Sequence, residues 1–320
     1  MLLPRGSGFF CSYLPTAFCL PPTGFCDYYR TMQPTRLSIL GVGLLGGSIG
    51  LACRAGTKPF HIMGYGHRRA SLDKAREFSA IDEAYDDPAA AVRESDFVIL
   101  CTPVGQFLPI LRQIAPALKP GALVTDVGST KRSVVRAAAE LLPPTVHFVG
   151  SHPIAGSEKR GVEFARADLF DKALCIITPT PHTNPEALDQ VESFWKTLGM
   201  RLTRLTPEEH DRFLADVSHL PHAVAAALIG MQSDAALALA GKGFLDATRI
   251  AGGDGGLWRD IFHDNADNLR DSIKRLRDQL DRLDRLLDPK QGRELSTWLD
   301  QTAARRELLL RQKLGEVTPD

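Results

Sequence analysis

The stretch at residues 37–50, LSILGVGLLGGSIG, constrains the fold more than any other segment of this chain. A short apolar run leads into the pattern Gly41-x-Gly43-x-x-Gly46, and a helical pattern begins near Leu45. In such a turn the glycines allow a tight bend, close approach of a pyrophosphate and close packing of helix on strand. The helix N-terminus then favours negative charge. The stretch therefore predicts a dinucleotide site with contacts from these three glycines and Leu45.

The composition favours neither a charged partner nor a membrane. Lys plus Arg number 38, as do Asp plus Glu, so no net field attracts nucleic acid or an anionic membrane. No run of eighteen apolar residues is present, and we expect no membrane span. No C-x-x-C pair occurs, and Cys53, Cys101 and Cys175 lie among apolar neighbours. These features predict a cytoplasmic protein with buried thiols and neither a zinc site nor a disulfide framework.

Residues 1–34 differ from the rest of the chain. They hold three of the six cysteines and four prolines before Pro34, with neither a helical nor a strand period. The prolines interrupt the apolar region that a secretion signal would need. We expect a disordered leader or an upstream start assignment, with Met32 as an alternative start, and exclude this segment from the fold.

Apolar runs alternate with helical patterns up to residue 205. The runs lie at residues 61–66, 96–104, 122–130, 146–161, 174–180 and 200–205. Alternation with short connections predicts a parallel sheet covered on both faces. We therefore expect an α/β fold in which residues 35–205 form a Rossmann-type dinucleotide-binding domain.

From Pro207 onward strand patterns disappear, and residues 206–320 are predicted to form an all-helical domain. Apolar residues there alternate at spacings of four and three, as in a heptad seam: Leu269, Ile273, Leu276, Leu280, Leu283 and Leu287. Residues 293–312 form a last predicted helix. The seam packs either on the core of its own domain or on a second subunit, and we favour a homodimer through the helical domain.

Cofactor choice depends on the end of the second predicted strand. Users of NAD carry an acidic residue there, which binds the ribose hydroxyls. This chain has Gly66 followed by His67, Arg68 and Arg69. Guanidinium groups match the 2′-phosphate of NADP, so we predict NADP over NAD. The alternative is that both arginines begin a solvated helix face.

Polar residues follow three successive predicted strands, at Thr102-Pro103, at 126–130 and at 151–158. In an open α/β sheet these strand ends line one crevice, so the three groups should converge, with Thr102 and Pro103 at the cofactor. His152 lies in one of them, inside the loop GSHPIAGSEK. Its ordinary pKa near neutrality suits a catalytic acid or base, and we predict that role.

Two further polar features lie in the helical half. His219 and His222 face the same way if their segment is helical. With His210 they could suggest a metal site, but no cysteine or HExxH pattern accompanies them, and we predict no metal. Arg249 precedes a glycine-rich bend, where its guanidinium suits a substrate carboxylate. A surface ion pair is the alternative for Arg249.

Five motifs together resemble the prephenate/arogenate dehydrogenase family. They are ILGVGLLGGSIG, TDVGSTK, GSHPIAGSEKRGVE, SHLPHAVAAAL and TRIAGGDGGLWRDIF, in this order over residues 37 to about 265. The resemblance implies NAD(P)-dependent oxidative decarboxylation of prephenate to 4-hydroxyphenylpyruvate, or of arogenate to tyrosine, in tyrosine biosynthesis. It also implies a homodimer.

The same resemblance implies roles for individual residues. His152 would bind the substrate ring hydroxyl and accept its proton as hydride leaves for nicotinamide. Ser129 would bind that hydroxyl or orient His152. The substrate-binding residues would be His219, His222 and Arg249, with Glu158 guarding the pocket.

Two other functions remain open from the sequence. A β-hydroxyacid-type NADP dehydrogenase would need a catalytic lysine in the helical half, where Lys242 is the candidate. A non-catalytic dinucleotide-sensing dimer would need the glycine turn but neither His152 nor Arg249.

Overall fold

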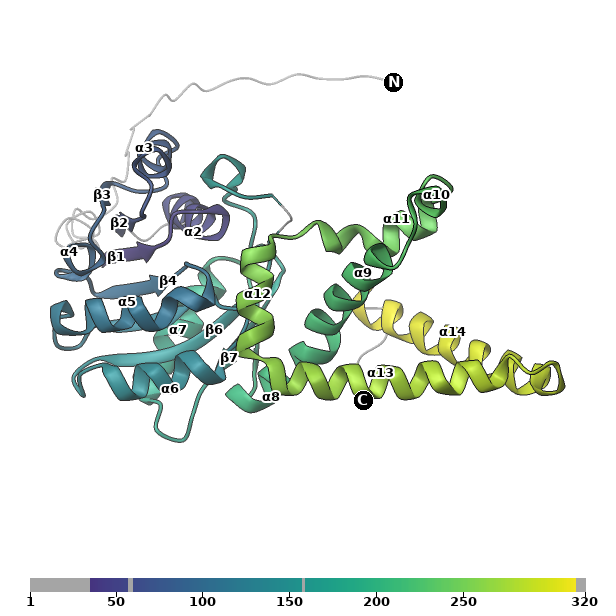
Figure 1. Ribbon diagram of the computed structural model, residues 1–320. Helices are drawn as coiled ribbons and strands as arrows, with labels where there is room; N and C mark the ends of the chain where they lie inside the picture. The colour runs from purple at the N-terminus through teal and green to yellow at the C-terminus, as the bar shows by residue number, and fades with distance from the viewer. Residues whose placement is uncertain (1–34, 57–59, 157–158, 315–320) are drawn as a thin grey trace, which may run out of the picture. The chain divides into compact units, whose positions relative to one another are not determined.

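The computed structural model describes residues 35–56, 60–156 and 159–314 (Figure 1). Its centre is an eight-stranded sheet in the order β3-β2-β1-β4-β5-β6-β7-β8. The strands are β1 (Thr35–Leu40), β2 (Phe60–Tyr65), β3 (Glu83–Tyr85), β4 (Phe97–Leu100), β5 (Leu123–Asp126), β6 (His147–Ile154), β7 (Leu174–Thr178) and β8 (Arg201–Arg204). The strand order reverses direction between β1 and β4, which is where such sheets bind ligands. The α/β prediction is confirmed.

The prediction of a parallel sheet was wrong for one pair of strands. β7 runs antiparallel to β6, whereas all other neighbouring strands are parallel. A parallel pair needs a crossover, usually a helix. Between β6 and β7 the described residues contain only the short 3₁₀ turn η3 (Val162–Phe164), so the chain returns directly. The strand β3 was not predicted from the sequence, because its three residues are too few to show the alternation of a strand.

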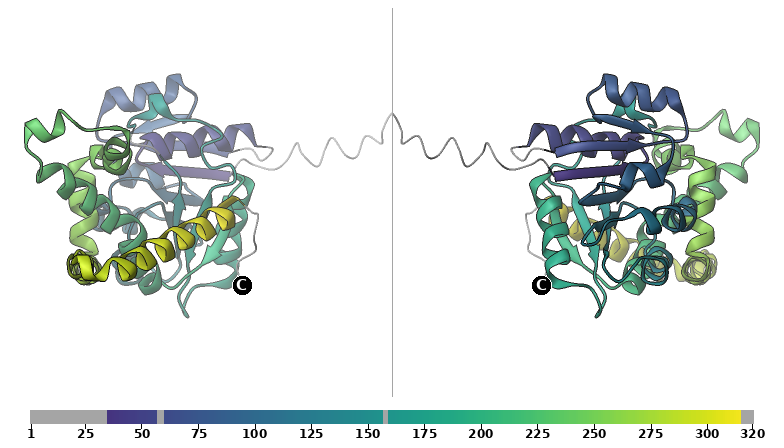
Figure 2. Two further views of the ribbon diagram at one scale, coloured as in Figure 1. Left: turned by 90° about the vertical axis from the view of Figure 1, so that its right-hand side faces the viewer. Right: turned by 90° about the vertical axis from the view of Figure 1, so that its left-hand side faces the viewer.

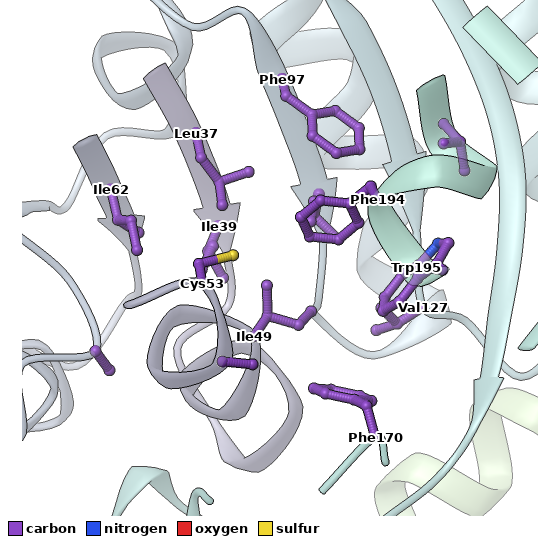
Figure 3. Packing of buried hydrophobic residues seen from close by; sticks show 14 of the residues in the cluster. Leu37, Ile39, Ile49, Cys53, Ile62, Phe97, Val127, Phe170, Phe194 and Trp195 are labelled. Atoms are coloured by element: carbon purple, nitrogen blue, oxygen red, sulfur yellow. The ribbon is translucent and has the colours of Figure 1, made fainter. Parts of the chain in front are cut away.

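Helices cover both faces of the sheet. One face carries α2 (Leu44–Ala55), α3 (Arg69–Glu77) and α7 (Pro185–Thr197), and the other carries α4 (Pro88–Val92), α5 (Phe107–Ile114) and α6 (Arg132–Leu141). Figure 3 shows the first face, where Phe194 of α7 packs edge-on against Phe97 of β4 with ring centroids 4.9 Å apart. Burial on both faces explains why the central strands are continuous apolar runs.

The helical half begins at Pro207, after a capping box formed by Thr206 and Glu209. Three segments form one continuous helical run, and seven further segments follow it in the described residues. They are α8 (Pro207–Leu214), the π-helical η4 (Ala215–His219) and α9 (Leu220–Gly230), then α10 (Asp234–Leu237), α11 (Lys242–Thr248), the 3₁₀ turn η5 (Arg249–Gly252), α12 (Gly255–Asp264), α13 (Ala266–Leu286), the 3₁₀ turn η6 (Pro289–Gln291) and α14 (Gly292–Leu314). No described residue beyond Arg204 is in a strand, so the all-helical prediction is confirmed.

Five of the six residues of the predicted heptad seam lie on α13 and Leu287 is its C-cap, but much of the seam is exposed. Leu269 is buried, whereas Ile273, Leu280 and Leu287 are 38%, 54% and 63% exposed. Figure 2 views the molecule from the end that carries α14 (yellow) and from the opposite end. The described residues therefore leave part of this apolar face uncovered, as a second subunit would require.

The run at residues 207–230 is the one described helix that is long and apolar enough to cross a membrane. Core helices of other proteins pass the same test of length and composition. Here the run carries His210 and Asp211, which are fully buried. Asp211 accepts backbone N–H groups at the start of α6, so this helix packs on the sheet domain through polar contacts.

Gly50 of α2 tests how closely this helix packs on the loop between α3 and β3. A Cβ atom at Gly50 would overlap the carbonyl oxygen of Ala80, whereas one at Gly56, at the end of the same helix, would make ordinary contacts of 3.5 Å or more. We expect Gly50→Ala to lower the free energy of unfolding by about 1–3 kcal/mol, and Gly56→Ala to change it by less than about 0.5 kcal/mol. Urea unfolding measures both, and equal stability of the two variants would contradict this packing.

Candidate active site

A buried ion pair fixes the ends of two central strands. Asp126, the last residue of β5, pairs with Lys131, and neither side chain is exposed to solvent. Ser151 of β6 joins this pair through its backbone, since its N–H donates to Asp126 Oδ1 (3.1 Å) and its carbonyl accepts from Lys131 Nζ (2.9 Å). The Ser151 hydroxyl also donates to the Asp126 carbonyl (2.6 Å). These hydrogen bonds fix the backbone immediately before the next residue, His152.

The helical half caps α6 from outside. This helix has no side-chain cap of its own at Lys131. Asp211 of α8 supplies one, because its carboxylate accepts the backbone N–H groups of Lys131 (2.7 Å) and Arg132 (3.0 Å). A carboxylate at a helix N-terminus is favourable. Arg132 also reaches Asp267 on α13, with N···O distances of 2.6 and 2.8 Å. These contacts join the two halves beside the strand ends.

His152 lies at the carboxyl end of β6 and is partly buried. Its Nδ1 is 2.9 Å from Nε2 of His210, and Nδ1 of His210 is 2.8 Å from Oδ1 of Asp211. Burial lowers the pKa of His152 well below its usual value, and burial likewise lowers the pKa of His210. Both rings are therefore neutral at neutral pH, and His152 is able to accept a proton.

His210 was not predicted as the partner of His152. Sequence spacing suggested His210 only as a possible metal ligand, and 58 residues separate it from His152 along the chain. The residue expected to orient His152, Ser129, lies in the loop after β5, where its backbone approaches the ring of His219. The Ser129 hydroxyl forms no hydrogen bond within the described residues. The structure thus places His210, and not Ser129, on Nδ1 of His152.

His219 and His222 follow one turn apart, as expected. Nδ1 of His219 lies 3.1 Å from Nδ2 of Asn265, and its Nε2 is buried without a hydrogen-bond partner among the described residues. The His222 ring stacks on Trp258 (centroids 3.6 Å apart, planes at 15°), and its buried Nδ1 likewise has no described partner. A Cβ at Gly253 would press on both rings, which explains a glycine there. Each ring thus keeps one buried nitrogen whose hydrogen-bonding capacity is not met within the described residues.

Arg249 is exposed in η5 and forms no hydrogen bond or ion pair with any described residue. The alternative interpretation of Arg249 as a member of a surface ion pair therefore finds no partner among the described residues. Glu158 lies outside the described residues, so its predicted role stays a prediction. The nearby Arg160 forms an ion pair with Asp254, which caps the N-terminus of α12.

The residues of the glycine turn fit a dinucleotide. Gly41 has φ +116°, and a Cβ there would overlap the backbone of Cys101 and Thr102. Around Gly43 nothing lies within 4 Å of the Cβ position, which leaves room for a phosphate. The N-terminus of α2, with Leu45 in its first turn, has no side-chain cap and no acidic residue. The hydroxyl of Thr102 is buried without a described partner, while Pro103 is exposed.

The residues predicted to choose the cofactor follow β2 and differ in their contacts. His67, Arg68 and Arg69 are all exposed. Arg69 pairs with Asp73 on α3 at 3.2 Å, whereas the side chain of Arg68 forms no ion pair with a described residue. Of the two arginines, Arg68 is therefore the one whose guanidinium has no ion pair among the described residues.

Within the described ranges, no group of three or more histidine, cysteine, aspartate or glutamate side chains is arranged to hold a metal ion. The histidines that sequence spacing had brought together serve other contacts: His210 binds His152 and Asp211, His219 faces Asn265, and His222 stacks on Trp258.

Comparison with known proteins matches both halves of the chain to domains of the same family. The family model described as "Prephenate dehydrogenase, nucleotide-binding domain" matches residues 49–204, and "Prephenate dehydrogenase, dimerization domain" matches residues 206–301. The chain is 34% identical to the prephenate dehydrogenase of Bacillus subtilis, over 86% of this chain and 76% of the relative. It is 36% identical to the cyclohexadienyl dehydrogenase of Zymomonas mobilis, over 72% and 80%.

A solved structure agrees with these matches. The prephenate dehydrogenase from A. aeolicus, in complex with hydroxyphenyl propionate and NAD⁺, matches with a TM-score of 0.81 and 35% identity. The match covers 87% of this chain and 99% of the other. The likeness therefore extends through the sheet domain and the helical half together.

The buried His219 predicts how stability depends on pH. Burial lowers its pKa from 6.5 to about 4. Between these values the unfolded chain binds a proton that the folded chain does not, so stability falls as pH drops from 6.5 toward 4. The contribution of His219 is complete above pH 6.5, and up to about 3 kcal/mol of it is lost by pH 4.

We expect His219→Gln to flatten the slope of unfolding free energy against pH by up to one proton. Urea unfolding at pH 7, 6 and 5 gives that slope. His182→Gln, which replaces an exposed histidine, is the control and should leave the slope unchanged. An unaltered slope in His219→Gln would show that folding does not lower the pKa of His219.

Proposed function

The chain belongs to the prephenate dehydrogenase family, and from this premise we propose that it oxidises and decarboxylates prephenate with a nicotinamide dinucleotide as hydride acceptor. The observation that carries the proposal is His152. It is a neutral imidazole at the carboxyl end of the parallel strands, and its Nδ1 is held by His210. A held neutral imidazole can take a proton at its other nitrogen.

The substrate ring hydroxyl gives its proton to His152. The hydride from the same carbon passes to the nicotinamide, the carboxylate on the opposite ring carbon leaves as carbon dioxide, and its electron pair makes the ring aromatic. His152 then returns the proton to the phenolate oxygen. No proton is gained or lost overall, so His152 returns to its starting state while the rest of the site positions and polarises the substrate.

Binding of the substrate carboxylates falls to groups in the helical half. Arg249 carries an exposed guanidinium without an ion pair among the described residues, and such a fork matches a carboxylate. His219 and His222 each have a buried ring nitrogen without a described partner. We assign all three to the substrate, with Ser129 near the ring hydroxyl and Glu158 at the rim.

Prephenate fits the described charges better than arogenate, which carries an ammonium group. The described carboxylates around these histidines are already paired. Asp211 accepts four N–H groups, Asp254 pairs with Arg160, and Asp264 accepts two hydroxyl groups. None of these is free to bind an ammonium group. We propose arogenate as a slower substrate.

The cofactor is held by the glycine turn and the N-terminus of α2, with Thr102 and Pro103 on the neighbouring strand. NADP is proposed as the preferred form, because Gly66 brings no acid and Arg68 is exposed without an ion pair among the described residues. The partner is a second copy of the chain, joined through the apolar face of α13 and α14, and the compartment is the cytoplasm.

The alternative functions find less support. Lys242, the lysine that a β-hydroxyacid-type dehydrogenase would use, is exposed at the start of α11 and forms no described hydrogen bond or ion pair. A non-catalytic dinucleotide sensor would have no use for a histidine oriented by His210 and Asp211 at the strand ends.

His152→Asn tests the proposed base. Purified protein should reduce the cofactor with prephenate, and the variant should lower kcat by about 100- to 10,000-fold, the usual yield of a positioned acid–base group. The KM values of substrate and cofactor should change little. His147→Asn, on the far end of the same strand, is the control. Near-normal turnover by His152→Asn would remove His152 from the mechanism.

Arg68→Ser tests the cofactor choice. The change should lower kcat/KM for NADP by about tenfold or more, the value of one charge-assisted contact, and leave kcat/KM for NAD unchanged. Arg69→Ser is the matched control, because Arg69 is engaged by Asp73. Equal use of both cofactors by the unmodified protein would contradict the NADP preference.

A second variant extends this test. A Cβ at Gly66 would make ordinary contacts of 3.4–3.5 Å, so an acid fits there without strain. Gly66→Asp combined with Arg68→Ser should turn the preference toward NAD, since the carboxylate repels a 2′-phosphate and binds a free 2′-hydroxyl.

A further inference from the structure

We propose that His210 and Asp211 form a positioning pair that sets the tautomer of His152, so that Nε2 of His152 is the atom that accepts the proton. The geometry of the pair stands by itself, whereas its effect on turnover rests on the proposed function. The pair lies at the start of the helical half and acts on a residue of the sheet domain.

The chain of donors and acceptors begins at Asp211. Its Oδ1 accepts the N–H of Lys131 (2.7 Å), and its Oδ2 accepts the backbone N–H and the Nε–H of Arg132 (3.0 and 3.2 Å). Burial by itself would raise the pKa of Asp211, but hydrogen bonds from His210 and from backbone N–H groups hold it below its usual value. Asp211 is thus an ionised carboxylate and can only accept hydrogen bonds.

The proton positions of both rings follow. Since Asp211 only accepts, Nδ1 of His210 carries the hydrogen over the 2.8 Å contact. His210 is neutral, so its Nε2 has a lone pair and accepts across the 2.9 Å contact from Nδ1 of His152. His152 is therefore protonated on Nδ1, and its Nε2 is left with a free lone pair. A free imidazole in water favours the opposite tautomer.

The hydrogen bonds around Asp211 also set the tautomer of His219, and they place its hydrogen on Nε2. The side-chain oxygen of Asn265 accepts from Arg132 (3.2 Å) and from Asn268 (2.8 Å), which fixes the amide orientation. Its Nδ2 then donates to the Asp211 carbonyl (2.7 Å) and faces Nδ1 of His219 (3.1 Å). Nδ1 of His219 is thus an acceptor, and Nε2 carries the hydrogen. The contacts of Asp211 with His210 and with Asn265 therefore leave His152 with a proton-accepting Nε2 and His219 with a donating one.

Two substitutions of His210 distinguish the loss of its hydrogen bond to His152 from a mere change in side-chain volume. In His210→Asn the amide is long enough to keep the contact with Asp211 and too short to reach His152. In His210→Gln the amide oxygen reaches the place of Nε2 and can accept from His152. Both residues are polar, so both keep a hydrogen-bonding group at this fully buried position. His147→Gln, on β6 and outside the site, is the control.

Nitrogen-15 NMR of histidine-labelled protein at neutral pH reads the tautomer directly. Unmodified protein and His210→Gln should show His152 protonated on Nδ1, and His210→Asn should show protonation on Nε2. In turnover, His210→Asn should lower kcat about 10- to 100-fold with both KM values unchanged, the usual effect of losing an orienting partner, and His210→Gln should recover most of it.

The proposal is overturned if His210→Asn keeps the Nδ1–H tautomer, or if it shifts the tautomer without lowering kcat. Should His210→Asn fail to fold, His210→Met fills the position without an acceptor and is judged by the same criteria. The NMR experiment needs no substrate. If the unmodified protein turns over neither prephenate nor arogenate, the proposed function fails while the tautomer result still decides the role of the pair.

Discussion

The buried ion pair between Asp126 and Lys131 is the interaction on which the rest of the site depends. Neither side chain reaches solvent, and removal of one partner from such a pair leaves an unpaired charge that costs about 3–5 kcal/mol. The pair joins the end of β5, the backbone of Ser151 and the N-cap residue of α6. The positions of His152 and of the α6 N-terminus both follow from it.

The second half of the site comes from the helices. Asp211 caps α6 and, through His210, holds His152, so a single carboxylate secures the domain contact and orients the proposed base. His210, His219 and His222 lie on one continuous helical run, in which the π-helical η4 follows His210 and ends at His219. Such π-helical turns are frequent at functional sites. The side-chain partner of His152 Nδ1 thus comes from the helical half and not from the sheet domain.

Local signals predicted much of this arrangement. The glycine turn and His152 have short sequence contexts that specify their surroundings, and the motif match identified the family. The antiparallel β7 was not predictable in this way, since its apolar run reads the same in either direction. Neither was the contact between His152 and His210, because it depends on how two distant segments pack. Full burial of Lys131 contradicts the usual place of lysine, and only the fold reveals it. Ser129, Glu158 and the domain boundary near residue 206 remain predictions.

The central claim is that oxidation and loss of carbon dioxide occur together on one substrate. A single-turnover experiment with prephenate measures it most directly, by counting reduced cofactor, carbon dioxide and aromatic product for each substrate consumed. The account predicts one of each. Reduced cofactor without carbon dioxide would be the result of a simple hydroxyacid dehydrogenase and would contradict it.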